Sequence, residues 1–93
     1  MKRFIIIRED SSFMMFPDGG GMSAVDSVDF LGVTTDVNAA NDFIRNFKMN
    51  DISDVTRDTI RNDTNGTGSL VRDIDTDDGD RTIRIFIKEV NDI

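Results

Sequence analysis

The stretch SLVRDIDTDDGDRTIRIFIKEV, residues 69–90, gives the clearest indication of the fold. Two runs rich in β-branched residues flank a polar segment that contains Gly79, a pattern typical of a β-hairpin. In the second run Ile83, Ile85 and Ile87 occupy every second position, so they share one face of a strand. We expect this isoleucine face to lie in the core and the alternate positions to stay partly exposed to water.

Length and composition favour one small domain built mainly from strands. The 93 residues, 38% of them hydrophobic, correspond to one domain, residues 1–93, with a thin margin of stability. Eleven isoleucines against two leucines favour strands over helices. Cysteine and histidine are absent, which excludes disulfides, thiolate nucleophiles and imidazole catalysis. Since no serine has a histidine partner, we expect no catalytic residues and a protein that is not an enzyme.

The charge balance is strongly acidic. Eleven Lys and Arg residues oppose 18 Asp and Glu residues, which gives a formal net charge of −7. Such a surface repels nucleic acid and anionic lipid, so we expect no nucleic-acid or membrane partner and allow for a basic protein partner. After the basic residues Lys2 and Arg3 only four apolar residues follow, too few for a secretory signal. We therefore expect a protein that is not secreted and is located in the cytoplasm.

The N-terminal half shows short apolar runs separated by polar turns. We expect a central strand over residues 2–8 and a second apolar run over residues 13–16 that forms a hairpin with it. Residues 18–23, DGGGMS, read as a loop, and a third strand is expected over residues 27–33. Strict alternation in that third strand places Val28 and Phe30 on one face, and Leu31 and Val33 on the other.

A helix is expected from residue 35 to residue 50. Its apolar residues recur at helical spacing behind an N-cap at Thr35 or Asp36: Val37, Ala40, Ile44 and Phe47. The opposite face carries Asn38, Asn41, Asp42, Arg45 and Asn46. For residues 51–62 we expect a short second helix, with a strand over residues 55–60 as the alternative.

Together these elements predict an α+β fold. It consists of an antiparallel sheet of about five strands with one or two helices on one face. A small, mainly β barrel or sandwich is the alternative.

Five aspartates between residues 73 and 80 form a candidate cation site, since carboxylates are the ligands that Ca²⁺ and Mg²⁺ prefer. Its ligands would be Asp73, Asp75, Asp77 and Asp80. The pattern departs from an EF-hand loop, because Gly79 stands at the seventh position and Arg84 replaces the bidentate glutamate at the twelfth. A solvated hairpin turn explains the aspartates better. We expect no cofactor beyond adventitious Ca²⁺ or Mg²⁺.

Four adjacent apolar residues form a candidate interface: Phe13, Met14, Met15 and Phe16. They cannot all face one core from a single strand, because successive side chains point to opposite faces. Either the strand is buried on both faces or one side contacts another copy of the chain, and a homo-oligomer is the natural expectation.

The opening MKRFIIIRED, residues 1–10, resembles small uncharacterised proteins of marine tailed bacteriophages. The resemblance implies a short phage-encoded accessory or virion-associated protein without known catalytic residues. Three hypotheses follow for its function. The first is a non-enzymatic structural or interaction protein that self-associates. The second is an acidic mimic of nucleic acid that inhibits a host defence nuclease, and the third is a weak divalent-cation-binding protein.

Overall fold

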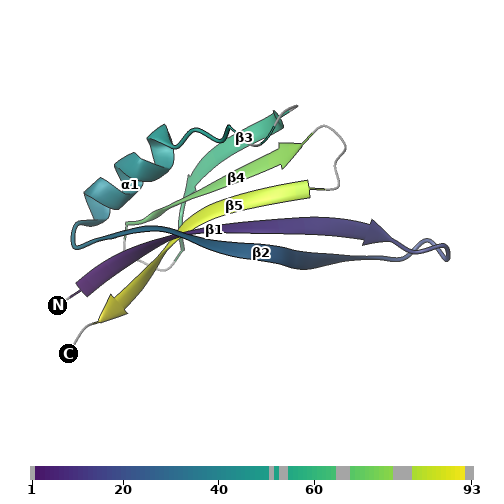
Figure 1. Ribbon diagram of the computed structural model, residues 1–93, viewed down its shortest axis with the longest axis horizontal. Helices are drawn as coiled ribbons and strands as arrows, with labels where there is room; N and C mark the ends of the chain where they lie inside the picture. The colour runs from purple at the N-terminus through teal and green to yellow at the C-terminus, as the bar shows by residue number, and fades with distance from the viewer. Residues whose placement is uncertain (1, 51, 53–54, 65–67, 77–80, 92–93) are drawn as a thin grey trace.

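The computed structural model describes residues 2–50, 52, 55–64, 68–76 and 81–91, and its strands form one antiparallel sheet (Figure 1). The elements are β1 (Lys2–Met15), β2 (Gly21–Thr34), α1 (Val37–Asn46), β3 (Val55–Asn62), β4 (Leu70–Thr76) and β5 (Arg81–Asn91). The strand order is β2-β1-β5-β4-β3, so the sheet is open, with β2 and β3 at its edges. A five-stranded antiparallel sheet with a helix is confirmed, and it does not close into a barrel.

The core lies between α1 and one face of the sheet. The predicted hairpin is present, with β4 paired antiparallel to β5 and Ile74 opposite Ile83. Ile83 and Ile85 are fully buried, which confirms the predicted isoleucine face. Among the described residues, the buried core cluster comprises Phe4, Ile6, Ala40, Ile44, Ile74, Ile83, Ile85 and Ile87. Each fully buried isoleucine contributes about 2 kcal/mol through the apolar surface that it removes from water.

Helix α1 begins as its sequence predicts, but its polar face differs at one position. The Asp36 carboxylate accepts a hydrogen bond from the Asn38 amide at 2.9 Å and caps the helix. Asn41, expected on the exposed face, is only 6% exposed. Its Nδ2 donates to the Gly68 carbonyl at 3.0 Å, and its Oδ1 accepts from the Leu70 amide at 2.9 Å. Asn41 therefore ties the helix to the start of β4.

Arg72 of β4 joins three elements. Its Nη1 donates to the carbonyls of Ile44 and Phe47, at 2.9 and 2.7 Å, where the last carbonyls of α1 have no helical partner. Its Nε and Nη2 donate to both carboxylate oxygens of Asp58 on β3, at 2.8 and 2.6 Å. These hydrogen bonds from Arg72 hold the pKa of Asp58 below its usual range, although burial opposes them. The guanidinium thus links the end of the helix to the edge strand.

The predicted second helix over residues 51–62 is wrong, and the alternative strand is confirmed. Strand β3 occupies Val55–Asn62 and pairs antiparallel with β4. Its Val, Thr and Ile residues restrict side-chain rotamers in a helix and fit an extended edge strand instead.

The predicted hairpin between residues 2–8 and 13–16 is also wrong. Strand β1 continues without a turn to Met15, and the chain reverses after it, where the Phe16 amide donates to the Gly20 carbonyl at 2.6 Å. Gly19, in this turn, has a φ of +93°, which favours glycine. The loop expected over residues 18–23 is therefore shorter, since β2 already begins at Gly21.

Ion pairing explains why the polar segment after Arg8 stays in the strand. Asp10 is 7% exposed and accepts from Arg8 Nε at 2.9 Å and from Arg81 Nη2 at 2.8 Å. Because all three side chains lie on the same face of adjacent strands, the carboxylate is compensated within the sheet. Burial alone raises the pKa of Asp10, but the hydrogen bonds from Arg8 and Arg81 outweigh it, so this pKa is lowered.

Replacing Arg72 tests its structural role. In Arg72→Ala the helix carbonyls and Asp58 lose their charged donor, and we expect the free energy of unfolding to fall by about 2–3 kcal/mol. Arg45→Ala is the matched control, since Arg45 pairs with Asp42 on the exposed side of α1 and should change stability by less than about 0.5 kcal/mol. Urea denaturation measures both values. Equal losses in the two variants would contradict the assigned role.

Replacing Asp10 tests the buried ion pairs through their pH dependence. A carboxyl whose pKa is lowered on folding stabilises the fold above its ordinary value of 3.8, and this stabilisation is lost as the pH falls below it. Asp10→Asn should lower the free energy of unfolding by about 3 kcal/mol at pH 7, because the neutral amide no longer compensates the charges of the buried Arg8 and the partly exposed Arg81. The difference from the unsubstituted protein should shrink between pH 4 and about 2.

Urea denaturation across this pH range provides the measurement. Asp42→Asn removes an exposed carboxylate and is the control, which should follow the unsubstituted protein at every pH. A constant deficit for Asp10→Asn down to about pH 2 would argue against the buried ion pairs.

Candidate functional site

The face of the sheet opposite α1, here called the open face, is the candidate functional surface. On β1 the side chains alternate between Phe4 and Ile6, which are buried in the core, and Ile5 and Ile7, which are only partly buried. Within the described part of the chain, no helix or strand packs against this second face. Its two halves differ in chemistry, being apolar near β2 and charged near β3.

The apolar half is a band of side chains that is continuous along β2 and interrupted by Glu9 on β1 and Lys88 on β5, and it is here called the open stripe. Phe30 lies opposite Ile7, which lies opposite Phe86 on the next strand, and Val33 lies opposite Ile5. Phe30 is 64% exposed and Val33 is 53% exposed. The stripe comprises Ile5, Ile7, Val25, Val28, Phe30, Val33, Phe86 and Val90.

Two β-bulges in β2 create this stripe. The pairing with β1 skips Leu31 and Asp26, which shifts the alternation at both places. Val33 and Phe30, and likewise Val28 and Val25, are three residues apart yet share a face. The prediction that Leu31 and Val33 lie on the same face is wrong, because Leu31 packs against the core. Gly32 was the one sequence signal for a bulge at this point.

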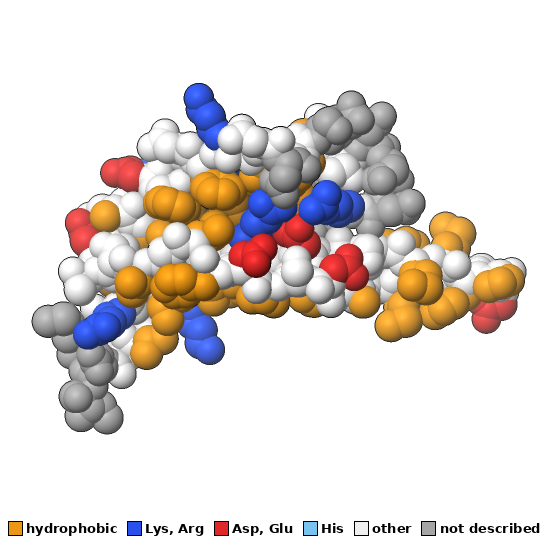
Figure 2. Space-filling view, in the orientation of Figure 1, with side chains coloured by type: hydrophobic (Ala, Val, Ile, Leu, Met, Phe, Trp, Pro, Cys, Tyr) orange, Lys and Arg blue, Asp and Glu red, His pale blue; other side chains and the backbone are white. Residues whose placement is uncertain are grey.

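The predicted interface residues lie at the far end of the β1–β2 hairpin, which extends beyond the other strands (Figure 1). Phe13, Met14, Met15 and Phe16 are between 40% and 73% exposed. Figure 2 shows hydrophobic side chains gathered at this end of the molecule. Phe13 lies over Gly21 on the open face and extends the stripe toward the tip, while Met14 pairs with Met22 on the other face. Their role as an interface stays a prediction.

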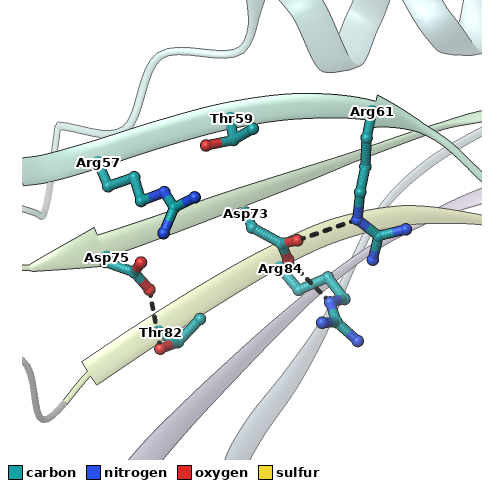
Figure 3. A pocket seen from close by; sticks show the side chains of 7 residues that line it. All are labelled: Arg57, Thr59, Arg61, Asp73, Asp75, Thr82 and Arg84. Carbon is teal, nitrogen blue, oxygen red and sulfur yellow. Dashed lines mark hydrogen bonds and ion pairs between the residues drawn. The ribbon is translucent and has the colours of Figure 1, made fainter.

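The charged half of the open face surrounds a hollow of about 350 Å³ (Figure 3). Three strands contribute to it, because Thr59 lies opposite Asp73 and Asp73 lies opposite Arg84. The lining residues are Arg57, Thr59, Arg61, Asp73, Asp75, Thr82 and Arg84. Alternate polar residues on β3, β4 and β5 therefore meet on one surface.

One carboxylate holds two guanidinium groups in this hollow. Asp73 Oδ1 accepts from Arg84 Nε at 2.8 Å, and Asp73 Oδ2 lies 3.4 Å from Arg61 Nε. The Nη atoms of both arginines point away from Asp73 (Figure 3) and have no hydrogen-bond partner among the described residues. The hydrogen bond with Asp73 raises the pKa of Arg84, which keeps its positive charge.

The other side of the hollow is less tightly paired. Thr82 Oγ1 donates to Asp75 Oδ1 at 3.1 Å. Arg57 lies beside Asp75 (Figure 3) but forms no ion pair with any residue that the structure describes. Arg61, by contrast, forms an ion pair with Asp73.

The predicted cation site is only partly covered by the structure. Asp73 and Asp75 lie on the open face and are engaged with Arg84, Arg61 and Thr82, whereas Asp77 and Asp80 lie outside the described residues. Among the residues that are described, no three acidic side chains come close enough to hold a metal ion. The cation site stays a prediction.

Comparison with known proteins adds no family to this picture. Neither the protein-family models, nor the curated proteins, nor the solved structures include a match to this chain. Within the described segments, α1 is too short and too polar to cross a membrane.

Titration with Ca²⁺ tests the cation site. Because the oxygens of Asp73 and Asp75 already accept hydrogen bonds from arginine and threonine, we expect millimolar Ca²⁺ to raise the melting temperature by less than about 1 °C. Differential scanning calorimetry at constant ionic strength measures the shift. A larger rise that disappears in Asp75→Asn, but not in the exposed control Asp42→Asn, would support the cation site instead.

Proposed function

We propose that this protein is a non-enzymatic interaction module that works as a self-associated assembly. The open stripe of one copy packs against the open stripe of a second copy. One observation carries the proposal, namely a continuous row of exposed valine and phenylalanine side chains along β2, flanked by partly buried apolar residues of β1 and β5. Contiguous exposed apolar surface of this kind marks sites of protein association.

The exposed area supports a second copy as the occupant. The accessible surface is 6154 Å² for a chain of 10.4 kDa. A compact monomer of this mass exposes about 5,400 Å², so the chain has an excess of roughly 750 Å². A stable interface buries about 800 Å² on each partner. The excess therefore has the size that one dimer contact removes.

The molecule is also longer than its mass requires. Its radius of gyration is 14.8 Å, and its longest extent is 49 Å. A compact chain of this length has a radius of gyration of about 12 Å. The projecting β1–β2 hairpin accounts for this shape. A second copy that packs along the hairpin would remove the apolar side chains of the stripe from water.

Contact through the face is favoured over pairing at the β2 edge. The bulges at Leu31 and Asp26 interrupt the regular row of backbone groups that an edge-to-edge contact needs. Asp26 and Asp29 add like charges that two antiparallel β2 strands would bring together. A two-fold arrangement of stripe on stripe, by contrast, places apolar side chains against apolar side chains and is self-complementary.

The charge distribution argues against two other hypotheses, a basic protein partner at the stripe and a mimic of nucleic acid. Two charges of opposite sign lie within the stripe, since Lys88 is opposite Ile5 and Glu9 is opposite Val28, so the stripe does not fit a strongly basic partner. A nucleic-acid mimic requires a field of one sign, whereas Arg61 and Arg84 interrupt the acidic surface beside Asp73. The self-associating module agrees with the virion-associated accessory protein that residues 1–10 suggest. That origin is part of the proposal.

The oligomeric state in solution tests the proposal. Light scattering should give the mass of a dimer, and moderate salt should not dissociate it, since apolar contacts resist screening and the net charge of −7 on each copy is screened. The double variant Phe30→Ser, Val33→Thr should weaken the dimer about 100-fold, because each copy loses roughly 1.5 kcal/mol of apolar burial.

Controls separate the stripe from other exposed apolar residues. Ile60→Ser changes a residue of β3 that is 42% exposed and lies outside the stripe, so it should leave the dimer intact. Met14→Ser, Met15→Ser tests the predicted tip interface separately. A monomer at all concentrations, or a dimer that only the tip variant dissociates, would refute stripe-on-stripe association.

A further inference from the structure

We propose that the hollow between β3, β4 and β5 binds a phosphate group, held by the side chains of Arg61 and Arg84. The structure offers two guanidinium groups side by side on an otherwise acidic chain. This inference does not depend on the stripe, which lies on the other half of the open face.

The first argument is the charge balance within the hollow. Asp73 is the sole described carboxylate bonded to Arg61 and Arg84, so this group of three side chains retains one positive charge. Arg57 lies opposite Asp75 on the neighbouring strand, without an ion pair between them, and these two side chains contribute no net charge to the hollow. Glu9 and Asp63 are close enough to raise the pKa of Arg84, but neither lines the hollow, whose lining of three arginines and two aspartates has one net positive charge.

The second argument is the direction of the donors. Asp73 accepts a hydrogen bond from Arg84 Nε and forms an ion pair with Arg61 Nε at 3.4 Å, and the Nη groups of both arginines have no partner among the described residues (Figure 3). The planar fork of a guanidinium donates in pairs to the oxygens of phosphate. An aspartate that holds an arginine from behind reduces the entropy that the arginine loses on binding a ligand.

The third argument is the size and accessibility of the hollow. Its volume of about 350 Å³ is ample for a phosphate group and lies at the lower end of the range for small-ligand pockets. The side chains of Arg61 and Arg84 are about half exposed, at 47% and 49%, so a ligand reaches them from solvent. The hydroxyl of Thr59 lines the same space as a further donor.

The shared chemistry is a phosphate dianion, which free phosphate and a phosphate ester both present. Titration of ¹⁵N-labelled protein with inorganic phosphate at pH 7, at an ionic strength kept constant with NaCl, should shift the Nε–H resonances of Arg61 and Arg84 in a saturable way. Phenyl phosphate in a parallel titration distinguishes an ester ligand, which should then bind at least tenfold more tightly than inorganic phosphate.

Matched variants decide the assignment. Arg84→Gln and Arg61→Gln should each weaken phosphate binding at least tenfold. If one of the two variants does not fold, the other still tests the site. Arg45→Gln removes an exposed arginine that is also paired with an aspartate, and it should change the affinity by less than twofold. Unsaturable shifts, or equal weakening by Arg45→Gln, would overturn the site.

The Phe30→Ser, Val33→Thr background keeps this test independent of self-association. Phosphate should bind the resulting monomer as it binds the unsubstituted protein. Loss of binding in that background would overturn the claim that the two halves of the open face act separately.

Discussion

Helix α1 has ten residues, whereas the longest strands of the sheet have fourteen, so the helix is too short to cover the whole length of the sheet. This difference in length determines which parts of the sheet stay exposed. An α-helix of ten residues is about 15 Å long, whereas a strand of fourteen residues reaches about 46 Å. Helix α1 is therefore about one third as long as β1 and β2. On the rest of the sheet ion pairs contribute to stability, whereas apolar side chains along β2 stay exposed.

Beyond the core that α1 covers, charged pairs take the place of a covering layer. Asp10 compensates Arg8 and Arg81 on the helix-side face of the sheet, and Arg72 ties the C-terminal end of α1 to β3. A buried ion pair is seldom better than apolar packing, but the loss of one partner is costly. Such pairs therefore stabilise one arrangement of the strands, because a shift in register would leave arginines unpaired.

The parts of the fold that depend on local sequence could be predicted. The β4–β5 hairpin, the buried face of Ile83, Ile85 and Ile87, and the capped helix at Asp36 each follow from spacing within one element. The open stripe could not be predicted, because strict alternation separates Val28 from Val25 and Phe30 from Val33. Only the bulges, which depend on the pairing of β2 with β1, bring these side chains together.

Other errors have the same origin in contacts between distant segments. The polar run from Asp10 to Ser12 resembles a turn until Arg81, far along the chain, is placed beside it. Residues 55–62 satisfy a helical pattern in isolation, and β4 supplies the strand partner that decides their conformation. The hollow between β3, β4 and β5 likewise combines alternate residues from three strands. Its sequence signal, Arg57-x-Thr59-x-Arg61, gains meaning only beside Asp73 and Arg84.

The two halves of the open face constrain how copies of the chain can associate. The charged side chains around Asp73 lie on the same face as the stripe. In a head-to-tail arrangement, Arg61 and Arg84 of one copy would contact valine and phenylalanine of the next. Their charges would lose water without gaining a polar partner, which costs free energy. Stripe on stripe about a two-fold axis avoids this cost. It also closes the assembly, since each copy uses its stripe once. The asymmetry of the face therefore favours a closed dimer over an open-ended fibre.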